Sequence, residues 1–338
     1  MIEVVGLAKR YDPGGVEALK GITFDVQAGE VFGFLGRNGA GKSTTVRILT
    51  TLIRATEGEA RVAGFDVRRQ PGQVRRALGA ALQEAALDEL MTGREHLTLA
   101  ARLAGLSRTA SRTRAGELLD AFGLAAAADR VAATYSGGMR RRLDVAMAMV
   151  RRPTVLFLDE PTTGLDPQGR RALWALIRDL RNEGAAVFLT TQYLAEADEL
   201  SDRVAIIHDG VIAAIGARDE LKDRLGTTTV RLRVTAGGLQ RLRHAFPPNE
   251  LTVNDDGWVT LRVPGGEASV PSTVGHLIAA GIQIERLEVH PPDLEDVFVK
   301  LTGAEIEAPA GSAGAGNGDS GAMALSAIRR GMGRQVAR

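Results

Sequence analysis

A glycine-rich run near the N-terminus constrains the fold more than any other feature of this chain. The apolar segment before it, 31–35, predicts a buried strand, and residues 44–49 after it predict the start of a helix. Two glycines separated by four residues and followed by Lys-Ser have the spacing of a phosphate-binding loop between a strand and a helix. The sequence therefore predicts an α/β fold with a phosphate site at this loop. The run is Gly36-Arg37-Asn38-Gly39-Ala40-Gly41-Lys42-Ser43-Thr44.

The residue types in this loop suit a nucleoside triphosphate and its metal. Glycines allow backbone N–H groups to approach the β-phosphate, and the positive end of the helix dipole points the same way. Lys42 is expected to reach the β- and γ-phosphates, and the Ser43 hydroxyl is expected to ligate Mg²⁺. We therefore predict that ATP and Mg²⁺ bind along residues 36–44. A strand-to-helix turn that binds nothing is the alternative interpretation.

A second motif supplies the other half of such a site. Four apolar residues at 155–158 predict a central strand, and Asp159 and Glu160 follow at its carboxyl end. Asp159 is expected to hold the metal through Ser43 or water, and Glu160 can polarise the water that attacks the γ-phosphate. Asp159 is therefore a candidate metal ligand and Glu160 the candidate general base. An isolated Asp-Glu pair would instead be a solvated strand end.

A third motif, Tyr135-Ser136-Gly137-Gly138-Met139, precedes a helical pattern over residues 140–147. A serine hydroxyl and the bare N–H groups of two glycines at a helix N-terminus form a second anion site. We therefore predict that Ser136, Gly137 and Gly138 contact a nucleotide. An ordinary helix cap is the alternative, although a cap needs no glycine pair after the serine.

Together these motifs resemble the ATP-binding subunits of ABC transporters. The run 135–139 resembles the family signature, and Gly164-Leu165-Asp166-Pro167 resembles its D-loop. Gln83 lies where the family has its Q-loop glutamine, and Tyr11 matches the aromatic residue that stacks on adenine. The resemblance implies an α/β fold of the P-loop NTPase type (ABC ATPase) with a helical subdomain. It adds Tyr11, Gln83 and Asp166 to the nucleotide site, and it also assigns Gln83 to the Mg²⁺.

The resemblance, which covers residues 1 to about 225, also implies two copies of the chain and a membrane partner. In the family two chains pack head to tail, so that each ATP lies between Lys42 of one chain and Ser136 of the other. Closure of this homodimer then supplies transition-state contacts in trans. The helical insert at 84–135 would be the lobe that meets an integral-membrane permease. Gln83, at the start of that lobe, would pass ATP occupancy to the permease.

Two positions depart from the family pattern. The family usually has a histidine after the strand at 186–191, but this chain has Gln192. A glutamine amide can donate a hydrogen bond to the γ-phosphate, although it cannot become an imidazolium. We therefore predict that Gln192 keeps a catalytic sensor role without a protonation switch, with a polar strand end as the alternative. Arg37 stands where the family generally has proline, and we expect this change to be tolerated.

Three longer segments narrow the resemblance to the daunorubicin/doxorubicin-resistance exporter subfamily. They are 134–142, 189–198 and Pro292-Asp293-Leu294-Glu295-Asp296-Val297-Phe298. The subfamily implies an ATPase that powers efflux of a drug or lipid-like amphiphile through a separate permease. A soluble ABC ATPase of translation or repair is an alternative, although the chain shows neither a second phosphate loop nor a long coiled-coil insertion. The ATPase subunit of an importer is the other alternative, because importers use the same type of ATPase domain.

Composition sets the outer limits. The net charge of +1 gives no case for nucleic acid as a partner, and a chain without cysteine has no disulfide or thiolate metal site. No stretch approaches the ~18 apolar residues that cross a bilayer, and the N-terminus lacks a signal-peptide pattern. We therefore expect the chain at the cytoplasmic side of the cell membrane, held there by its permease. The histidines are scattered without ligand spacing, so no protein-only metal site is expected.

The chain is predicted to have three parts. Residues 1–226 form the ABC ATPase domain, which contains the helical subdomain at 84–135. Residues 227–303 have the order strand, helix, strand, strand, helix, strand, helix, which predicts a small α+β ferredoxin-like domain for dimer support or regulation. Residues 304–338 begin with Ala, Gly and Ser and form a flexible tail, which ends in a short basic amphipathic helix or in plain disorder.

Four local signals accompany this organisation. Thr92 to Glu95 is a capping box that opens a helix, and Asp209-Gly210 between two apolar runs predicts a hairpin. Asn254-Asp255-Asp256-Gly257 predicts a second hairpin turn, in the small domain. The stretch from Asp66 to Arg76 is polar and arginine-rich, and we expect it to be a connection.

Overall fold

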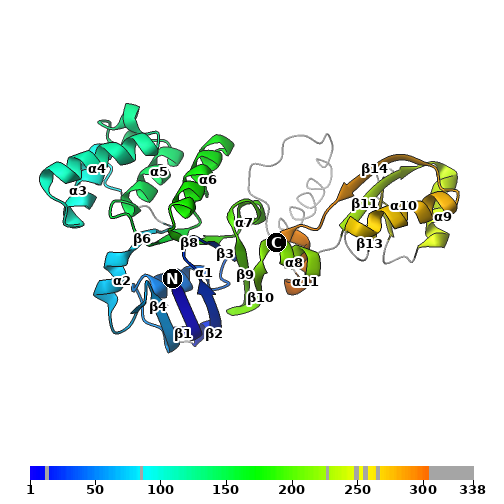
Figure 1. Cartoon of the computed structure of the whole chain (residues 1–338), viewed down its shortest axis with the longest axis horizontal. Coiled ribbons are helices and arrows are strands. Elements are labelled where there is room, and N and C mark those ends of the chain that lie inside the picture. Colours follow the sequence, from blue (N-terminus) through cyan, green and yellow to red (C-terminus); the bar gives the residue numbers. More distant parts are fainter. Residues whose placement is uncertain are drawn as a thin grey trace, which may run out of the picture. The chain divides into compact units, whose positions relative to one another are not determined.

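The structure is a computed structural model that describes residues 1–11, 15–83, 87–225, 228–246, 251–253, 258–263 and 267–303. By its contacts the chain divides into two units, Met1–Ile306 and Glu307–Arg338. All described helices and strands belong to the first unit (Figure 1). The hairpin turn predicted at 254–257 and the tail predicted at 304–338 lie outside the described residues.

A six-stranded sheet forms the centre of the N-terminal part, in the order β10-β9-β3-β8-β7-β6. Neighbouring strands from β9 to β6 run parallel, and β10 pairs antiparallel with β9. Strands β3, β7 and β8 are buried at every position, which is why each is an almost unbroken apolar run in the sequence. The strands are β3 (Val31–Leu35), β6 (Leu78–Ala81), β7 (Val155–Asp159), β8 (Ala186–Thr191), β9 (Arg203–His208) and β10 (Val211–Ala217).

The two faces of this sheet bury separate hydrophobic clusters, because side chains alternate along each strand. One face meets the helices, and its strand residues are Val31, Ala81, Leu156, Leu158, Val187 and Leu189. The other face carries phenylalanines whose ring centroids are 5.4 to 5.8 Å apart, a spacing at which aromatic rings attract one another. Four of these rings belong to the central sheet, namely Phe32, Phe34, Phe157 and Phe188, and a fifth, Phe24 of the covering strand β2 (Val16–Val26), packs against them.

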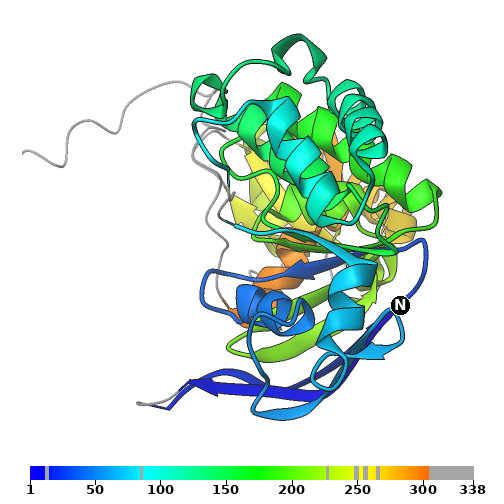
Figure 2. The same cartoon turned by 90° about the vertical axis from the view of Figure 1, so that its left-hand side faces the viewer.

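An antiparallel sheet in the order β2-β1-β4-β5 and helix α1 (Lys42–Leu49) cover the phenylalanine face. Figure 2 shows this sheet on the opposite side of the molecule from the cyan helices. The predicted connection from Asp66 to Arg76 is wrong in part, because Pro71–Ala77 form helix α2. Pro71 suits the first turn, where a missing N–H costs no hydrogen bond. The strands are β1 (Ile2–Tyr11), β2 (Val16–Val26), β4 (Glu57–Val62) and β5 (Phe65–Asp66).

The helical insertion packs on the other face of the central sheet (Figure 1). The predicted capping box is confirmed, since Thr92 and Glu95 each accept a hydrogen bond from the other's backbone N–H. The Tyr135 hydroxyl donates to the carbonyl oxygen of Ala127 at 2.7 Å and fixes the chain just before α5. The helices of the insertion are α3 (Gly93–Leu103) and α4 (Arg108–Ala121), with 3-10 turns η1 (Ala125–Ala127) and η2 (Ala132–Thr134), and α5 (Gly137–Ala148) follows the insertion.

Two further helices follow α5 on the chain, α6 (Pro167–Asn182) and α7 (Leu194–Leu200). The predicted hairpin between β9 and β10 is confirmed. Asp209 has φ 47° and Gly210 has φ 79°, so both central residues have the positive φ of a type I′ turn.

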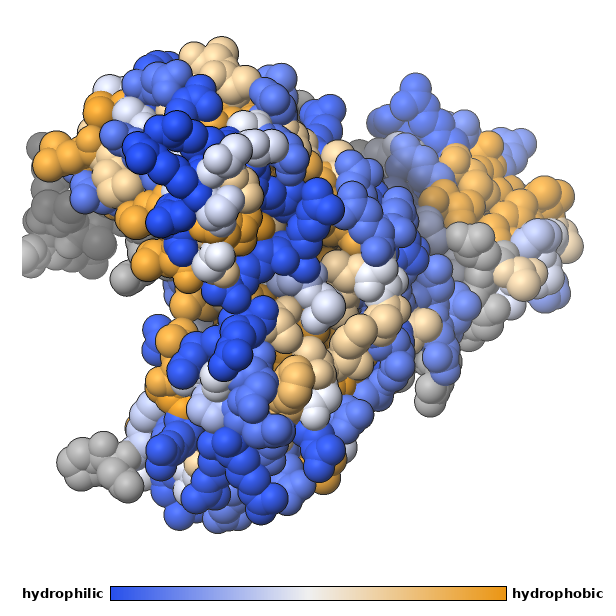
Figure 3. Space-filling model, turned by 60° about the vertical axis from the view of Figure 1, so that its left-hand side comes forward, coloured by the Kyte–Doolittle hydropathy of each residue, from blue (hydrophilic) through white to orange (hydrophobic). Residues whose placement is uncertain are grey.

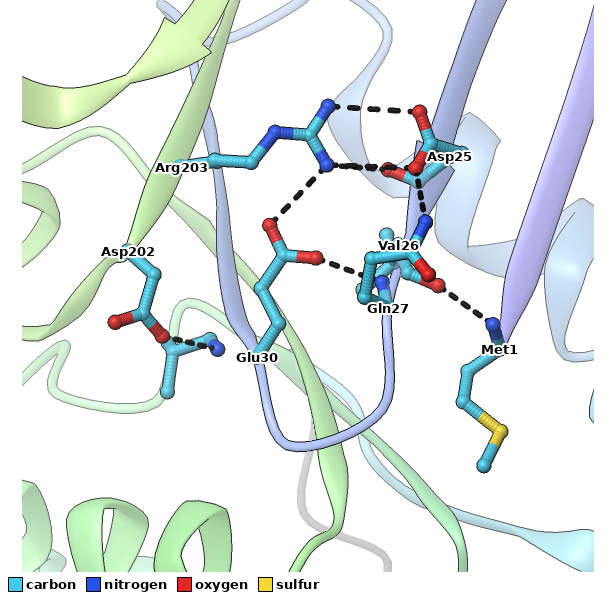
Figure 4. A network of polar contacts seen from close by, with 8 residues as sticks. Met1, Asp25, Val26, Gln27, Glu30, Asp202 and Arg203 are labelled. Carbon is cyan, nitrogen blue, oxygen red and sulfur yellow. Dashed lines mark hydrogen bonds and ion pairs between the residues drawn. The ribbon is translucent and has the colours of Figure 1, made fainter. Parts of the chain in front are cut away.

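A polar network joins the edge of the antiparallel sheet to β9 (Figure 4). The amino group of Met1 donates to the carbonyl oxygen of Val26 at 2.6 Å. Arg203 forms ion pairs with Asp25 at 3.4 Å and with the buried Glu30 at 3.3 Å. The network therefore fixes the turn between β2 and β3, and with it the strand that leads into the phosphate-binding loop.

The C-terminal part contains a four-stranded sheet in the order β12-β13-β11-β14, with all neighbours antiparallel. With one helix after β11 and one before β14, this is the predicted ferredoxin-like arrangement, so the predicted fold is confirmed. Its core is formed mainly by residues of β11, β13, α9 and α10. The elements are β11 (Thr228–Val234), α9 (Ala236–Ala245), β12 (Leu251–Val253), β13 (Trp258–Val263), η3 (Glu267–Ser269), α10 (Val270–Ala279) and β14 (Ile284–His290).

The last described helix, α11 (Leu294–Thr302), packs against α7 and α8 (Arg218–Leu225). Its apolar side chains share one hydrophobic cluster with Leu35 of β3 and with residues of α7, α8 and β9. The chain therefore returns to the central sheet after the ferredoxin-like domain. The predicted domain boundaries stay a prediction. The buried residues of α11 are Leu294, Val297 and Phe298.

Candidate nucleotide site

The loop from Gly36 to Gly41 leaves β3 and enters α1 directly. The N–H of Gly36 donates to the carbonyl oxygen of Thr191 at 3.3 Å, so the loop begins beside the end of β8. A Cβ on Gly36 would lie 2.5 Å from the carbonyl oxygen of Ile207. Gly41 has φ 112°, and a Cβ there would lie 2.7 Å from the carbonyl oxygen of Ala18. Only glycine fits these two positions, as a loop that presents its backbone to a phosphate requires.

The Lys42 side chain lies inside this loop. Its Nζ donates to the carbonyl oxygens of Gly36 at 2.8 Å and Arg37 at 3.2 Å, and it lies 3.3 Å from Oε1 of Glu160. Burial lowers the pKa of Lys42 below its ordinary value, while Glu160 and, less strongly, Asp159 oppose that shift. The ammonium group is thus a buried cation held by negative groups. The exposed side of the loop consists of Arg37, Asn38 and Gly39, whereas Ala40 is buried.

The acidic pair lies where β7 ends. Oδ1 of Asp159 accepts a hydrogen bond from the Thr190 hydroxyl of the neighbouring strand. Glu160 has φ 48°, a left-handed conformation that costs a non-glycine residue about 1–3 kcal/mol. Its N–H donates to the carbonyl oxygen of Thr190 at 3.0 Å. The backbone turn therefore directs the Glu160 carboxylate toward Lys42.

Four predicted site residues follow four neighbouring strands. Strands β3, β8, β7 and β6 run parallel in that order, so their carboxyl ends share one edge of the sheet. Gly36 follows β3, Gln192 follows β8 and Glu160 follows β7. Gln83 lies two residues after β6 and is exposed, whereas Gln192 is half-buried. The structure thus brings the loop, the candidate base, the candidate sensor and the Q-loop glutamine to one edge.

Tyr11 and the first turn of α1 lie beside the loop. The Tyr11 hydroxyl is 3.4 Å from Oγ1 of Thr44, and Nζ of Lys9 lies 5.1 Å from the centre of the Tyr11 ring. Tyr11 is 38% exposed, which leaves ring surface for stacking with a flat base. Ser43 is half-buried in the same turn of α1 as Lys42.

The signature and the D-loop residues cap helices. Oγ of Ser136 accepts a hydrogen bond from the N–H of Met139 at 3.2 Å, and Oδ1 of Asp166 accepts one from the N–H of Gly169 at 2.8 Å. Gly137 and Gly138 form the first turn of α5, where backbone N–H groups have no partner within the helix. Across the described ranges, no hydrogen bond or ion pair joins these residues to the phosphate-binding loop of the same chain.

A buried ion pair that the sequence motifs do not predict lies next to this site. Arg141 and Asp144 on α5 lie 2.9 Å apart, and both side chains are largely buried. Burial raises the pKa of Asp144 to about 6 in spite of the arginine. The available signal was the Arg-Asp spacing of three residues, which places both side chains on one helix face. The ion pair was not predicted, because a run of basic residues indicates a solvent-exposed helix face.

These residues fit a nucleoside triphosphate with Mg²⁺. The loop offers glycine N–H groups and a buried ammonium to phosphate oxygens. The Ser43 hydroxyl and the Asp159 carboxylate are oxygen donors, the type that Mg²⁺ prefers alongside phosphate oxygens. The parallel sheet, the loop, the acidic pair and the helical insertion that ends in the signature define a P-loop ATPase of the cassette class.

Comparison with known proteins agrees with this class. A family model described as ABC transporter matches residues 19–163, and one described as ATP-binding protein DrrA1-3-like, C-terminal domain, matches residues 216–302. The chain is 43% identical to the daunorubicin/doxorubicin resistance ATP-binding protein DrrA of Streptomyces peucetius, over 89% of this chain and 92% of the relative. It is 42% identical to the doxorubicin resistance ATP-binding protein DrrA of Mycobacterium tuberculosis, over 89% and 93% of the two chains.

A solved structure supports the fold as well. It is a dimeric ATP-binding cassette in a post-hydrolysis state bound to ADP and Pi, with a TM-score of 0.60 and 26% identity over 64% of this chain and 98% of that chain. The chain therefore belongs to the ATP-binding proteins of ABC transporters, and within them to the daunorubicin/doxorubicin-resistance type. The family predicted from the motifs is confirmed, and ATP binding and hydrolysis are its activity. These relatives do not favour the translation, repair or importer alternatives.

Proposed function

We propose that this chain hydrolyses ATP to power the export of a drug or lipid-like amphiphile through a separate membrane permease. The observation that carries this proposal is the convergence of Lys42 and Glu160 at the end of parallel strands, with 3.3 Å between Nζ and Oε1. The direction of transport rests on relatives that are named for resistance to daunorubicin, doxorubicin and linearmycin.

The residues of the phosphate edge divide the reaction between them. Lys42 would leave its loop carbonyls for the β- and γ-phosphates, and Glu160 would accept a proton from the attacking water. Gln192 would donate to the γ-phosphate. When bound, Mg²⁺ neutralises phosphate charge, and Ser43, Asp159 and Gln83 are the proposed residues that hold it. The loop backbone from Gly36 to Thr44 would bind the remaining phosphate oxygens.

The remaining site residues act between two copies of the chain in this proposal. Ser136 and Gly137 are exposed, and among the described residues no hydrogen bond or ion pair joins them to their own phosphate-binding loop, which supports a role at the nucleotide of a second copy. Gly138 would add its N–H there, and Asp166 would join the two sites across the homodimer. Tyr11 would stack on the adenine of its own nucleotide.

The helical insertion is the proposed contact with the permease. Leu99 and Leu103 lie four residues apart on α3 and are 47% and 76% exposed, and the nearby Leu90 is 84% exposed. Figure 3 shows apolar residues among hydrophilic ones on this lobe. Within the described ranges, none of the helices has the length and hydrophobicity of a membrane span. The proposed location is the cytoplasmic side of the cell membrane, through the permease.

Inverted membrane vesicles that contain the chain and its permease test this proposal. We expect ATP-dependent accumulation of doxorubicin in the vesicles, accompanied by faster ATP hydrolysis when the drug is present. Glu160→Gln should abolish both signals while the complex still assembles. A rate of ATP hydrolysis that does not change with drug or permease would contradict the export function. Drug movement in the opposite direction would indicate import.

A further inference from the structure

Helix α5 carries a buried arginine that reaches three backbone carbonyl groups in two segments of the chain. The Arg141 side chain is 8% exposed, and it donates four hydrogen bonds. One of them goes to the Asp144 carboxylate at 2.9 Å. The other three go to the carbonyl oxygens of Leu82, Asp159 and Pro161. The cation therefore connects α5 to the ends of two strands of the central sheet.

Two of these carbonyl groups flank the candidate base. Nη2 of Arg141 donates to Asp159 at 2.6 Å, and Nε donates to Pro161 at 3.1 Å. The residue between them is Glu160. Because the N–H groups of a guanidinium have a fixed planar arrangement, one arginine sets the positions of both carbonyl oxygens relative to each other. Arg141 thus holds the backbone on both sides of Glu160.

The backbone of Glu160 needs such support. Its φ of 48° is disfavoured for a residue with a Cβ, and such a conformation persists only where the surroundings impose it. Thr190 contributes one restraint, because its carbonyl oxygen accepts from the N–H of Glu160. Arg141 contributes the restraints on the flanking carbonyl groups.

The third carbonyl links the base to the Q-loop. Leu82 follows β6 and directly precedes Gln83. Nη1 of Arg141 donates both to Leu82 and to Asp144, so the same nitrogen joins the Q-loop to α5. A displacement of α5 would therefore act on the backbone next to Gln83 and on the backbone around Glu160.

We propose that Arg141 is a positioning residue that holds Glu160 in its left-handed conformation and joins it to the Q-loop and the signature helix. The inference rests on the proposed role of Glu160 as the base. Helix α5 begins with Gly137 and Gly138, which we assign to the nucleotide of a second copy. Closure on that nucleotide would reach the base of the same chain through Arg141. The two ATP sites of the dimer are coupled by this route.

Replacing Arg141 with lysine in the full-length chain tests the role of the guanidinium group. Arg141→Lys keeps the charge but loses the planar set of donors. We expect kcat to fall about 10- to 100-fold while KM and the affinity for ADP stay nearly unchanged, because the base is misplaced and the phosphate loop is not. The matched control is Arg142→Lys. Arg142 lies on the same helix but donates to Phe122 at 3.0 Å, so its kcat should stay within about twofold of wild type.

Hydrogen exchange gives a second readout that does not depend on catalysis. In Arg141→Lys we expect faster amide exchange at residues 82, 83, 160, 162 and 163, with no change in Arg142→Lys. If Arg141→Lys does not fold, Asp144→Asn replaces it, because it removes the charge that holds Nη1. We expect that variant to show a smaller fall in kcat, unchanged KM and faster exchange at 82–83.

The proposal is overturned by wild-type kcat and exchange in folded Arg141→Lys, by equal losses in both lysine variants, or by a rise in KM alone. If Arg141→Lys does not fold, wild-type kcat and exchange in Asp144→Asn would overturn the proposal. Glu160→Gln serves as the reference. Normal hydrolysis in that variant would refute Glu160 as the base, and the exchange data would still decide whether Arg141 holds this backbone.

Discussion

Nζ of Lys42 lies 3.3 Å from Oε1 of Glu160, and the two side chains are only 4% and 7% exposed. Removing one partner of such a buried pair leaves an uncompensated charge, which costs about 3–5 kcal/mol. The pair therefore contributes to stability, in addition to the chemistry proposed for it. Substitutions that keep the shape and the hydrogen bond separate the two roles better than truncation does.

Glu160→Gln is the sharpest test of the proposed base. The amide oxygen can still accept from Lys42, but the group can no longer take a proton from water. We expect ATP hydrolysis to fall about 10²- to 10⁴-fold and the ATP-bound dimer to accumulate. Steady-state hydrolysis and size-exclusion chromatography with ATP measure the two effects. The exposed Glu183, changed to Gln, is the control, and normal turnover in Glu160→Gln would overturn the assignment.

The phosphate-binding loop should tolerate a methyl group at Gly39 better than at Gly41. Both residues have positive φ, so alanine at either position is strained by about 1–2 kcal/mol. At Gly39 a Cβ meets nothing within 4 Å, whereas at Gly41 it would lie 2.7 Å from the carbonyl oxygen of Ala18. We expect Gly41→Ala to lose nucleotide binding and stability well beyond Gly39→Ala. Calorimetric ADP binding and thermal unfolding compare the two variants, and equal behaviour would contradict the predicted clash.

Gln192 should act as a donor that does not titrate. We expect Gln192→Ala to lower kcat by about 10²-fold, because one hydrogen bond to the γ-phosphate is lost. Gln192→His should restore activity and add an inflection at about pH 6.5 to the plot of kcat against pH. Kinetics over the neutral pH range measure this difference from the wild type. Unchanged hydrolysis in Gln192→Ala would remove Gln192 from the site.

Asp144 should make stability depend on pH. Burial raises its pKa to about 6 from an ordinary value of 3.8, so the folded state binds the proton more tightly than the unfolded state. The contribution of Asp144 to the free energy of unfolding therefore falls as pH rises from about 4 to about 6, by about 3 kcal/mol in total. Asp144→Asn should gain stability relative to wild type across this range. Urea unfolding of both proteins at several pH values checks this prediction. A difference in their free energies of unfolding that does not change with pH would contradict it.

The phosphate edge could be predicted because its requirements are local. Lys42 and Ser43 must follow the glycines at fixed spacing, and parallel strands carry Glu160 and Gln192 to the same edge once their apolar runs are recognised. Arg141 could not be predicted, because its acceptors are carbonyl groups of residues far away in the sequence. Every residue has a backbone carbonyl group, so the residue types do not show which carbonyl groups accept these hydrogen bonds.

Helix α2 was missed for a related reason. Its sequence from Pro71 is polar, and a single buried residue, Val74, anchors it. With Val74 as its one large apolar side chain, this segment gives no helical period. The ferredoxin-like domain was predictable from its alternation of apolar strands and helices, but the return of α11 to the central sheet was not, because an amphipathic helix does not specify the surface that it covers.

Phe298 of α11 should stabilise the ATPase part of the chain. It is fully buried in the cluster that contains Leu35 of β3, so Phe298→Ala should cost about 3–5 kcal/mol. The exposed Lys300, changed to Ala on the same helix, is the control and should be nearly neutral. Thermal unfolding in the presence and absence of ADP checks both, and equal midpoints for the two variants would contradict the packing.

The return of α11 makes the ferredoxin-like domain an insertion rather than an appendage. Leu35 contacts the cluster of α11 and directly precedes Gly36, the first residue of the loop. A chimera that exchanges this domain between relatives must therefore keep residues 294–302 from the same parent as β3. A truncation after α8 would expose the apolar surface that α11 covers. It would therefore produce an aggregation-prone fragment and not an independent ATPase domain.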